Sequence, residues 1–149
     1  MLSVVCACRG ATVTASDLNP RAIENTLINA SYHAIKINVL QSDVFNNIPL
    51  QAFDCIIINP PYYARNPNNN EELAWYCGEN FEYFQKLFNG LSSYIHETSL
   101  VIMVLTLGCE LDKIFEIAKR KGFLFELLEE RNVLFDGKDF LYRINKISN

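Results

Sequence analysis

Four consecutive residues, Asn59-Pro60-Pro61-Tyr62, carry the clearest chemical signal in this sequence. They follow the run 54–58, an aspartate, a cysteine and three isoleucines, which predicts a buried strand. The side-chain carbonyl of Asn59 and the backbone carbonyl of Pro60 can accept hydrogen bonds from both N–H groups of a planar NH2. Proline stiffens this backbone, and Tyr62 can stack on a flat group. Because an amide or aromatic amine nitrogen is a poor nucleophile, such orientation favours methyl transfer to it. A rigid turn at a strand end is the alternative.

Two aspartates upstream stand where other predicted strands end. Asp17 closes the β-rich stretch 11–16, and Asp43 follows the short strand 36–40. Ligands of parallel sheets bind at the carboxyl ends of strands, so Asp17, Asp43 and Asn59 are expected to converge on one rim. Asp17 is suited to the ribose hydroxyls of a nucleoside cofactor and Asp43 to an adenine amino group. Each could instead serve only its local turn.

The elements between these tips alternate in type. Asn19 and Pro20 predict the start of a helix, with Ile23, Leu27 and Ala30 along one apolar stripe. Further helices are expected from the apolar spacing over 81–95 and 111–118, and further strands at 100–105, 123–131 and 140–147. Asp136-Gly137 predicts a hairpin within 135–138. This order predicts an α/β fold with a mostly parallel sheet, flanked by helices and closed by an antiparallel C-terminal hairpin strand.

Composition excludes several classes of protein. The chain has 149 residues and a formal charge of -4, which fits one domain and does not favour tight duplex binding. No apolar run is long enough to span a bilayer. Five cysteines without a CxxC pair predict a reduced, cytoplasmic protein with buried thiols and no metal site. His33 and His96 are interpreted as lone histidines rather than metal ligands.

Taken in order, these segments resemble a known family. Asp17-Leu18-Asn19-Pro20, Ser42-Asp43-Val44-Phe45 and Asn59-Pro60-Pro61-Tyr62 are similar to class I S-adenosylmethionine-dependent methyltransferases. The best match is the small-domain group that includes release-factor glutamine and adenine-N6 methyltransferases. The resemblance implies a Rossmann-like sheet and S-adenosylmethionine as cofactor. It implies that Asp17 holds the ribose and Asp43 the adenine amino group. Leu18 and Val44 would border the adenine, and Asn59 with Pro60 would hold the target nitrogen.

The sequence departs from this family at its beginning. The family's first strand and its glycine-rich loop, which wraps the methionine part of the cofactor, have no counterpart, since only Gly10 precedes Asp17. Residues 2–9 align with the helix after that loop, although Val4-Val5-Cys6 could also be strand-like. We therefore expect a single, N-terminally truncated domain over 1–149 that lacks the first strand. A second copy could repair the sheet as a homodimer.

Two functions remain open. The first is N-methylation of a protein glutamine, as in release factors, or of a nucleic-acid adenine, since both present a planar NH2. The second is a non-catalytic or cofactor-deficient domain of the same fold. The polar stretch 64–72 is either a solvated connection or a substrate lid, and Tyr63 and Trp75 either line a pocket or pack.

Overall fold

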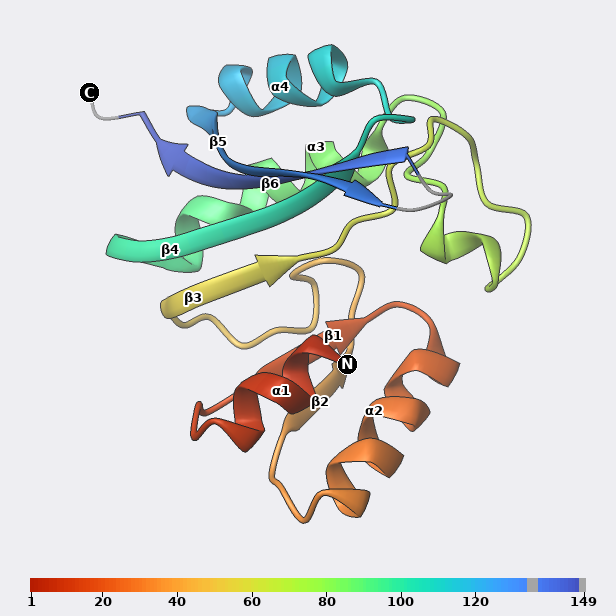
Figure 1. Cartoon of the computed structure of the whole chain (residues 1–149), viewed down its shortest axis with the longest axis vertical. Helices are drawn as coiled ribbons and strands as arrows, with labels where there is room; N and C mark the ends of the chain where they lie inside the picture. The colour runs from red at the N-terminus through yellow and green to blue at the C-terminus, as the bar shows by residue number, and fades with distance from the viewer. Residues whose placement is uncertain (134–136, 148–149) are drawn as a thin grey trace. The chain divides into compact units, whose positions relative to one another are not determined.

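The structure, a computed structural model, describes residues 1–133 and 137–147 (Figure 1). It divides into two compact units, Met1–Pro49 and the chain from Leu50 onward. Each unit has its own β-sheet, with two strands in the first and four in the second.

The first unit places two parallel strands beside two helices. Its elements are α1 (Leu2–Cys8), β1 (Thr14–Asp17), α2 (Pro20–Tyr32) and β2 (Asn38–Gln41). Strands β1 and β2 pair over four residues, from Thr14 opposite Asn38 to Asp17 opposite Gln41. Helix α2 contacts both strands, and α1 contacts α2.

Helix α2 begins as the sequence predicts. Asn19 is the N-cap, its side chain accepts a hydrogen bond from the Arg21 backbone N–H at 3.0 Å, and Pro20 stands at the first helical position. The predicted apolar stripe is only partly right, because Ala30 is buried but Leu27 is exposed. The strand-like alternative for residues 4–6 is wrong, because these residues lie in helix α1.

The second unit is built on a four-stranded sheet in the order β3-β4-β6-β5. The strands are β3 (Phe53–Ile58), β4 (Ile95–Thr106), β5 (Phe123–Val133) and β6 (Gly137–Lys146). Strands β3 and β4 are parallel, while β6 runs antiparallel to both β4 and β5. Three strands therefore share one direction and the C-terminal strand opposes them. This arrangement confirms the predicted α/β fold with an antiparallel hairpin strand.

Helices α3 (Glu82–Gly90) and α4 (Leu111–Arg120) pack against each other, and α4 also contacts β5. The predicted core face of α3 is confirmed, since Phe84, Leu87 and Phe88 are buried. The predicted helix nevertheless ends early. The short 3-10 helix η2 (Leu91–Ser93) follows α3, and Ile95 already belongs to β4. Helix α4 ends at Arg120, and Gly122 follows it with a φ of 83°, a left-handed conformation that suits glycine after a helix.

The strand before Asn59 is less buried than its apolar sequence predicts. Only Ile58 of β3 is buried, and Ile57 is exposed. The reason is topological, because β3 lies at the edge of its sheet and pairs only with β4 among the described strands. Strand β4 likewise buries Val101, Met103 and Leu105 on one face and leaves Leu100 exposed on the other.

Two further observations concern the pairing of strands. Strands β5 and β6 form the predicted C-terminal hairpin, but Phe135 and Asp136 of its predicted turn lie outside the described residues. In the first unit β1 pairs only with β2. Thus no described strand occupies the second edge of β1 or of β3.

Candidate functional site

Asp17 and Asp43 lie at the same edge of the first unit's sheet. Asp17 is the last residue of β1 and pairs in register with Gln41, the last residue of the parallel strand β2. Asp43 follows two positions later. The Asp17 Oδ1 atom accepts a hydrogen bond from the Asn19 backbone N–H at 2.8 Å, so this carboxylate supports the turn into α2. A carboxylate offers about four acceptor sites, so this one contact leaves capacity for a diol.

The segment that presents Asp43 is a tight turn. Ser42 is buried, and its hydroxyl donates to the Val44 carbonyl and accepts from the Asn47 N–H, both at 3.0 Å. Val44 has a φ of 53°, a left-handed conformation that is uncommon for a β-branched residue. Its side chain is half-buried. The surrounding hydrogen bonds therefore hold a strained residue beside Asp43.

Leu18 shares this edge with the aspartates. Its carbonyl accepts a hydrogen bond from the Gln41 side-chain amide at 3.1 Å, and its side chain is exposed. The first unit thus brings together all four residues predicted to contact the nucleoside: Asp17, Leu18, Asp43 and Val44.

In the second unit, Asn59 directly follows the carboxyl end of β3. Its side chain is exposed and makes no hydrogen bond to the residues that the structure describes. Pro60 is buried, and Pro61 and Tyr62 are half-buried. A carboxamide without an internal partner, held on a partly buried proline backbone, is available to accept and donate hydrogen bonds to a ligand.

The backbone after Asn59 is fixed by a second segment of the chain. The N–H groups of Tyr62 and Tyr63 both donate to the Trp75 carbonyl, at 3.1 and 2.9 Å, and the Cys77 N–H donates to the Tyr63 carbonyl at 3.0 Å. Tyr63 and Tyr76 form an isolated parallel bridge. Residues 64–74, including the 3-10 helix η1 (Glu72–Ala74), therefore form a loop whose two ends are joined by these hydrogen bonds. We call the joined backbone of residues 62–63 and 75–77 the neck.

A buried thiol, Cys77, and a glycine, Gly108, support this neck, and sequence reasoning did not single them out for it; a second buried thiol, Cys109, donates to the Thr106 carbonyl. The Tyr63 hydroxyl would lie 3.2 Å from a Cβ added to Gly108, so Tyr63 lies against the loop after β4. The Cys77 thiol donates to the Tyr63 carbonyl at 3.3 Å. Burial raises the pKa of the Cys77 thiol to about 11 and also raises the pKa of Cys109, so both thiols are neutral at pH 7. They act as packing groups. Cys8 and Cys55 are exposed, so the predicted burial of the thiols is only partly right.

The convergence of all three strand tips is not settled by either unit alone. Asp17 and Asp43 share an edge in the first unit, and Asn59 stands at the corresponding carboxyl end of a strand in the second. Their meeting on one rim stays a prediction.

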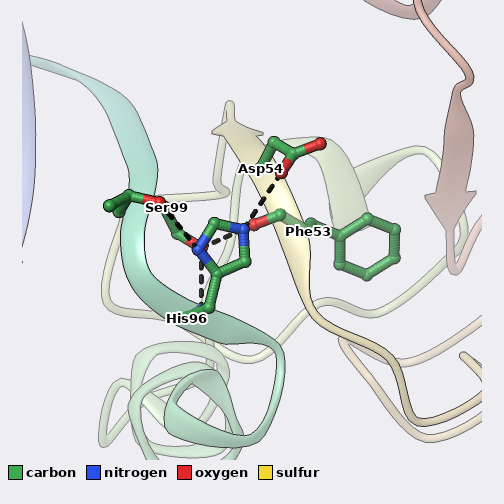
Figure 2. Close-up of polar contacts among 5 residues, drawn as sticks. Phe53, Asp54, His96 and Ser99 are labelled. Atoms are coloured by element: carbon green, nitrogen blue, oxygen red, sulfur yellow. Dashed lines mark hydrogen bonds and ion pairs between the residues drawn. The ribbon is translucent and has the colours of Figure 1, made fainter.

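His96 has a partner that its isolation in the sequence did not reveal. Its Nε2 atom lies 3.0 Å from Oδ1 of Asp54, and its Nδ1 atom lies 3.1 Å from the Thr98 hydroxyl (Figure 2). Ser99 accepts from the His96 N–H and donates to the Phe53 carbonyl. These contacts lie at the amino ends of β3 and β4, opposite Asn59. Pairing across strands brings them together, which residue spacing does not show.

The described chain offers neither a metal site nor a membrane-spanning helix. Among residues 1–133 and 137–147, no three His, Cys, Asp or Glu side chains are grouped closely enough to hold a metal ion. Within the same residues, no helix has both the length and the apolar character required to cross a membrane.

Comparison with known families decides the relationship of the chain. The family model described as methyltransferase small domain matches residues 1–76, about half of the sequence. The chain belongs to this family. S-adenosylmethionine is the cofactor of this family.

Individual relatives agree with the methyltransferase small domain assignment. A Methanocaldococcus jannaschii protein, provisionally named a protein N5-glutamine methyltransferase, is 28% identical over 145 residues, which cover 91% of this chain and 72% of that protein. The Salmonella typhimurium release factor glutamine methyltransferase is 38% identical over 72 residues, covering 47% of this chain and 26% of the relative.

A solved structure shows the same fold. The ribosomal protein L11 methylase from Lactobacillus delbrueckii subsp. bulgaricus matches with a TM-score of 0.69 and 18% identity, covering 99% of this chain and 64% of that one. The chain therefore spans less than two thirds of that methylase, and about a quarter of the Salmonella relative.

The residues present fit one part of the cofactor. Asp17 offers an exposed carboxylate for a ribose diol, and Asp43 stands beside it with Leu18 and Val44 as apolar neighbours. The methionine part lacks such a match, since no glycine-rich turn joins a strand to a helix before Asp17 in the described chain. The fit thus extends to the nucleoside only.

Proposed function

We propose that this chain belongs to an N-methyltransferase that transfers the methyl group of S-adenosylmethionine to the side-chain nitrogen of a protein glutamine. When bound, the cofactor supplies an electrophilic methyl group. The Asn59 side chain and the Pro60 carbonyl accept hydrogen bonds from the two N–H groups of the target amide. These bonds direct the nitrogen lone pair towards the methyl group. Pro61 fixes the backbone, and Tyr62 stacks on the amide plane. The nitrogen becomes acidic once methylated, so it can release its proton without a strong base.

The observation that carries this proposal is the state of the Asn59 carboxamide. It is exposed and makes no side-chain hydrogen bond within the described chain, although its backbone is held by a buried proline and a closed neck. A preorganised acceptor of this kind stabilises developing charge without reorganisation at the moment of reaction.

Asp17 is proposed to hold the ribose hydroxyls and Asp43 the adenine amino group, with Leu18 and Val44 against the adenine faces. Their common edge supports the assignment. Substituting Asp17 with Asn should weaken binding of S-adenosylhomocysteine, measured by calorimetric titration. Glu24→Gln, on the exposed part of α2, is the control.

Protein glutamine is preferred to a nucleic-acid adenine for two reasons. Two relatives carry names that specify glutamine, and the formal charge of -4 does not favour a polyanion. The test is transfer of a labelled methyl group to a release factor, to bulk RNA and to DNA in parallel. Labelling of the release factor alone is expected, and labelling of nucleic acid alone would reverse the assignment.

Asn59→Ala should lower turnover of the labelled protein by a factor of about 10² to 10³, typical of one lost preorganised contact, while the circular dichroism spectrum is retained. Asn89→Ala, an exposed position on α3, is the matched control. Equal turnover for Asn59→Ala and the parent chain would remove the assigned role.

A second function is favoured by one specific observation. No glycine-rich turn that could hold the methionine part of the cofactor is formed by residues 1–133 and 137–147. A cofactor-deficient binding domain is therefore the alternative. Calorimetric titration with S-adenosylhomocysteine separates the two, because tight binding removes the alternative and absent binding supports it.

Two subsidiary predictions accompany the proposal. The second edges of β1 and β3 are unpaired among the described strands, and a second copy of the chain could cover them, which sedimentation over a range of concentrations would detect. The five free cysteines support a reducing, cytoplasmic location, which fluorescence microscopy of the tagged protein would test.

A further inference from the structure

The neck beside Asn59 exposes two large aromatic side chains. Trp75 is 53% exposed and Tyr63 is 39% exposed, although their backbones are joined by the hydrogen bonds described above. We call Tyr63 and Trp75 the aromatic platform. Tryptophan and tyrosine are enriched in binding interfaces because they offer a large contact area with few rotatable bonds. An exposed tryptophan at this position therefore requires an explanation beyond packing.

The backbone of the platform is held by hydrogen bonds within the chain. Trp75 is held through its carbonyl, which accepts two N–H groups, and through its own N–H, which donates to the Glu72 carbonyl at 3.0 Å. The Tyr63 ring lies against Gly108 and packs edge-on to Tyr62, with ring centroids 4.8 Å apart. Since this backbone is already ordered in the folded chain, less ordering cost remains when a partner binds.

The longer segment that carries Trp75, residues 64–82, is strongly acidic. Residues 64–82 contain four glutamates and a single arginine. The one cation is engaged, because the Arg65 guanidinium lies 4.9 Å from the Tyr76 ring centroid and donates to the Tyr76 hydroxyl at 3.3 Å. Glu72 accepts from the Asn68 backbone and side chain, which lowers the pKa of Glu72 and keeps it ionised.

We propose that the aromatic platform and the surrounding carboxylates dock a cationic polypeptide segment that flanks the methylated glutamine. This inference rests on the proposed function and specifies its substrate. Tyr63 directly follows the motif Asn59–Tyr62, so a peptide whose amide reaches Asn59 continues over Tyr63 and Trp75. The neighbouring chain packs on the two rings, and its lysine or arginine side chains lie near Glu71, Glu79 and Glu82.

An exposed tryptophan can also stack on a nucleobase, so single-stranded RNA is the competing occupant. The charges oppose it. Proteins that bind single strands track the phosphates with a basic groove, whereas residues 64–82 carry four carboxylates and one arginine. Each carboxylate repels phosphate and attracts a cationic peptide.

Trp75 is the only tryptophan in the chain, so its fluorescence reports occupancy of the platform directly. Three probes are titrated: a synthetic peptide with one central glutamine flanked by glycines and lysines, the same peptide with glutamates for lysines, and oligoadenylate RNA. We expect saturable quenching or a spectral shift with the lysine peptide alone, and weakening as salt is raised. Binding of RNA, or equal binding of both peptides, would overturn the proposal.

Variants then locate the contact through the anisotropy of the labelled lysine peptide. Trp75→Ala should weaken binding by roughly tenfold or more, as loss of an interface anchor does, whereas Leu124→Ala, an exposed apolar position on β5, should not. Glu71→Gln combined with Glu79→Gln should weaken binding and reduce its salt dependence. Glu97→Gln, an exposed position on β4, is the matched control.

Catalytic measurements separate this inference from the function on which it rests. In a methyl-transfer assay with a protein acceptor, Trp75→Ala should raise KM and leave kcat nearly unchanged, whereas Asn59→Ala should lower kcat. Transfer to protein without any effect of Trp75→Ala on KM would remove the docking surface and keep the proposed function. Peptide binding at Trp75 without methyl transfer to any acceptor would keep the surface and remove the function.

Discussion

The two units of this chain differ most in how they are stabilised. The first has a two-stranded sheet, and its buried hydrophobic residues are Val4 and Ala30. The second has four strands and fully buried Phe84, Phe88 and Phe123. A pair of short strands is marginal by itself, whereas a larger sheet covered by helices supports a stable core. The residues proposed for the nucleoside thus occupy the weaker scaffold and the acceptor motif the stronger one.

Core substitutions should show this difference most strongly. Phe84 is 0% exposed and packs near the rings of Phe81 and Tyr83, so Phe84→Ala should lower the free energy of unfolding by about 3–5 kcal/mol. Leu27→Ala on exposed α2 should change it by less than about 0.5 kcal/mol. Urea unfolding followed by circular dichroism measures both. Similar losses for the two variants would contradict the contrast between the units.

Two glycines with similar backbone angles allow a sharper comparison. Gly78 has a φ of 93°, and an added Cβ would overlap the Glu82 side chain, whereas Gly10 has a φ of 91° and open space around it. Gly78→Ala should therefore cost about 1–3 kcal/mol through strain and clash, and Gly10→Ala about 1 kcal/mol through strain alone. Thermal unfolding of the pair gives the difference. A larger loss for Gly10→Ala would show that packing around Gly78 adapts freely.

The helix cap tests the first unit by itself. Asn19→Ala removes the side-chain acceptor for the Arg21 N–H and should cost about 1 kcal/mol. Amide hydrogen exchange in α2 should accelerate while exchange in β4 is unchanged, because local opening of one unit does not require opening of the other. Asn25→Ala, inside the same helix, is the control. Equal acceleration in both units would show that they open together.

The pH dependence of stability should be the smallest effect. The ordinary pKa of 9.0 for the Cys77 thiol is raised by burial to about 11. The folded chain then holds its proton where the unfolded chain loses it, so stability is full below pH 9 and falls as pH rises towards 11. The loss from this thiol is about 0.4 kcal/mol at pH 9. Cys77→Ala should flatten the slope of unfolding free energy against pH, and exposed Cys8→Ala should not.

Sequence reasoning located the features that depend on local chemistry. The start of helix α2 at Asn19 and Pro20 was predictable, as were the positions of Asp17, Asp43 and Asn59 at or just beyond strand ends, because each depends on a few adjacent residues. The direction of the strands was also predictable, since it follows from the alternation of strands and helices.

Features that depend on distant pairing were not predictable. The bridge between Tyr63 and Tyr76 closes a polar loop that has no apolar periodicity. Gly108, which follows the end of β4, lies against Tyr63 although the two are distant in sequence. The exposure of Ile57 follows from the edge position of β3, which the apolar run does not encode. His96 finds Asp54 only because β3 and β4 are adjacent.

The contacts of His96 and Ser99 have a consequence for which side chains form the core. Phe53 pairs with Ile95, yet Cys55 pairs with Leu100, so two steps along β3 correspond to five along β4. An odd surplus of residues inverts the inside–outside alternation of everything that follows. Since residues 100–105 are all apolar, their types do not choose the inward set. The number of residues in the polar insertion before them therefore determines that Val101, Met103 and Leu105 face the core.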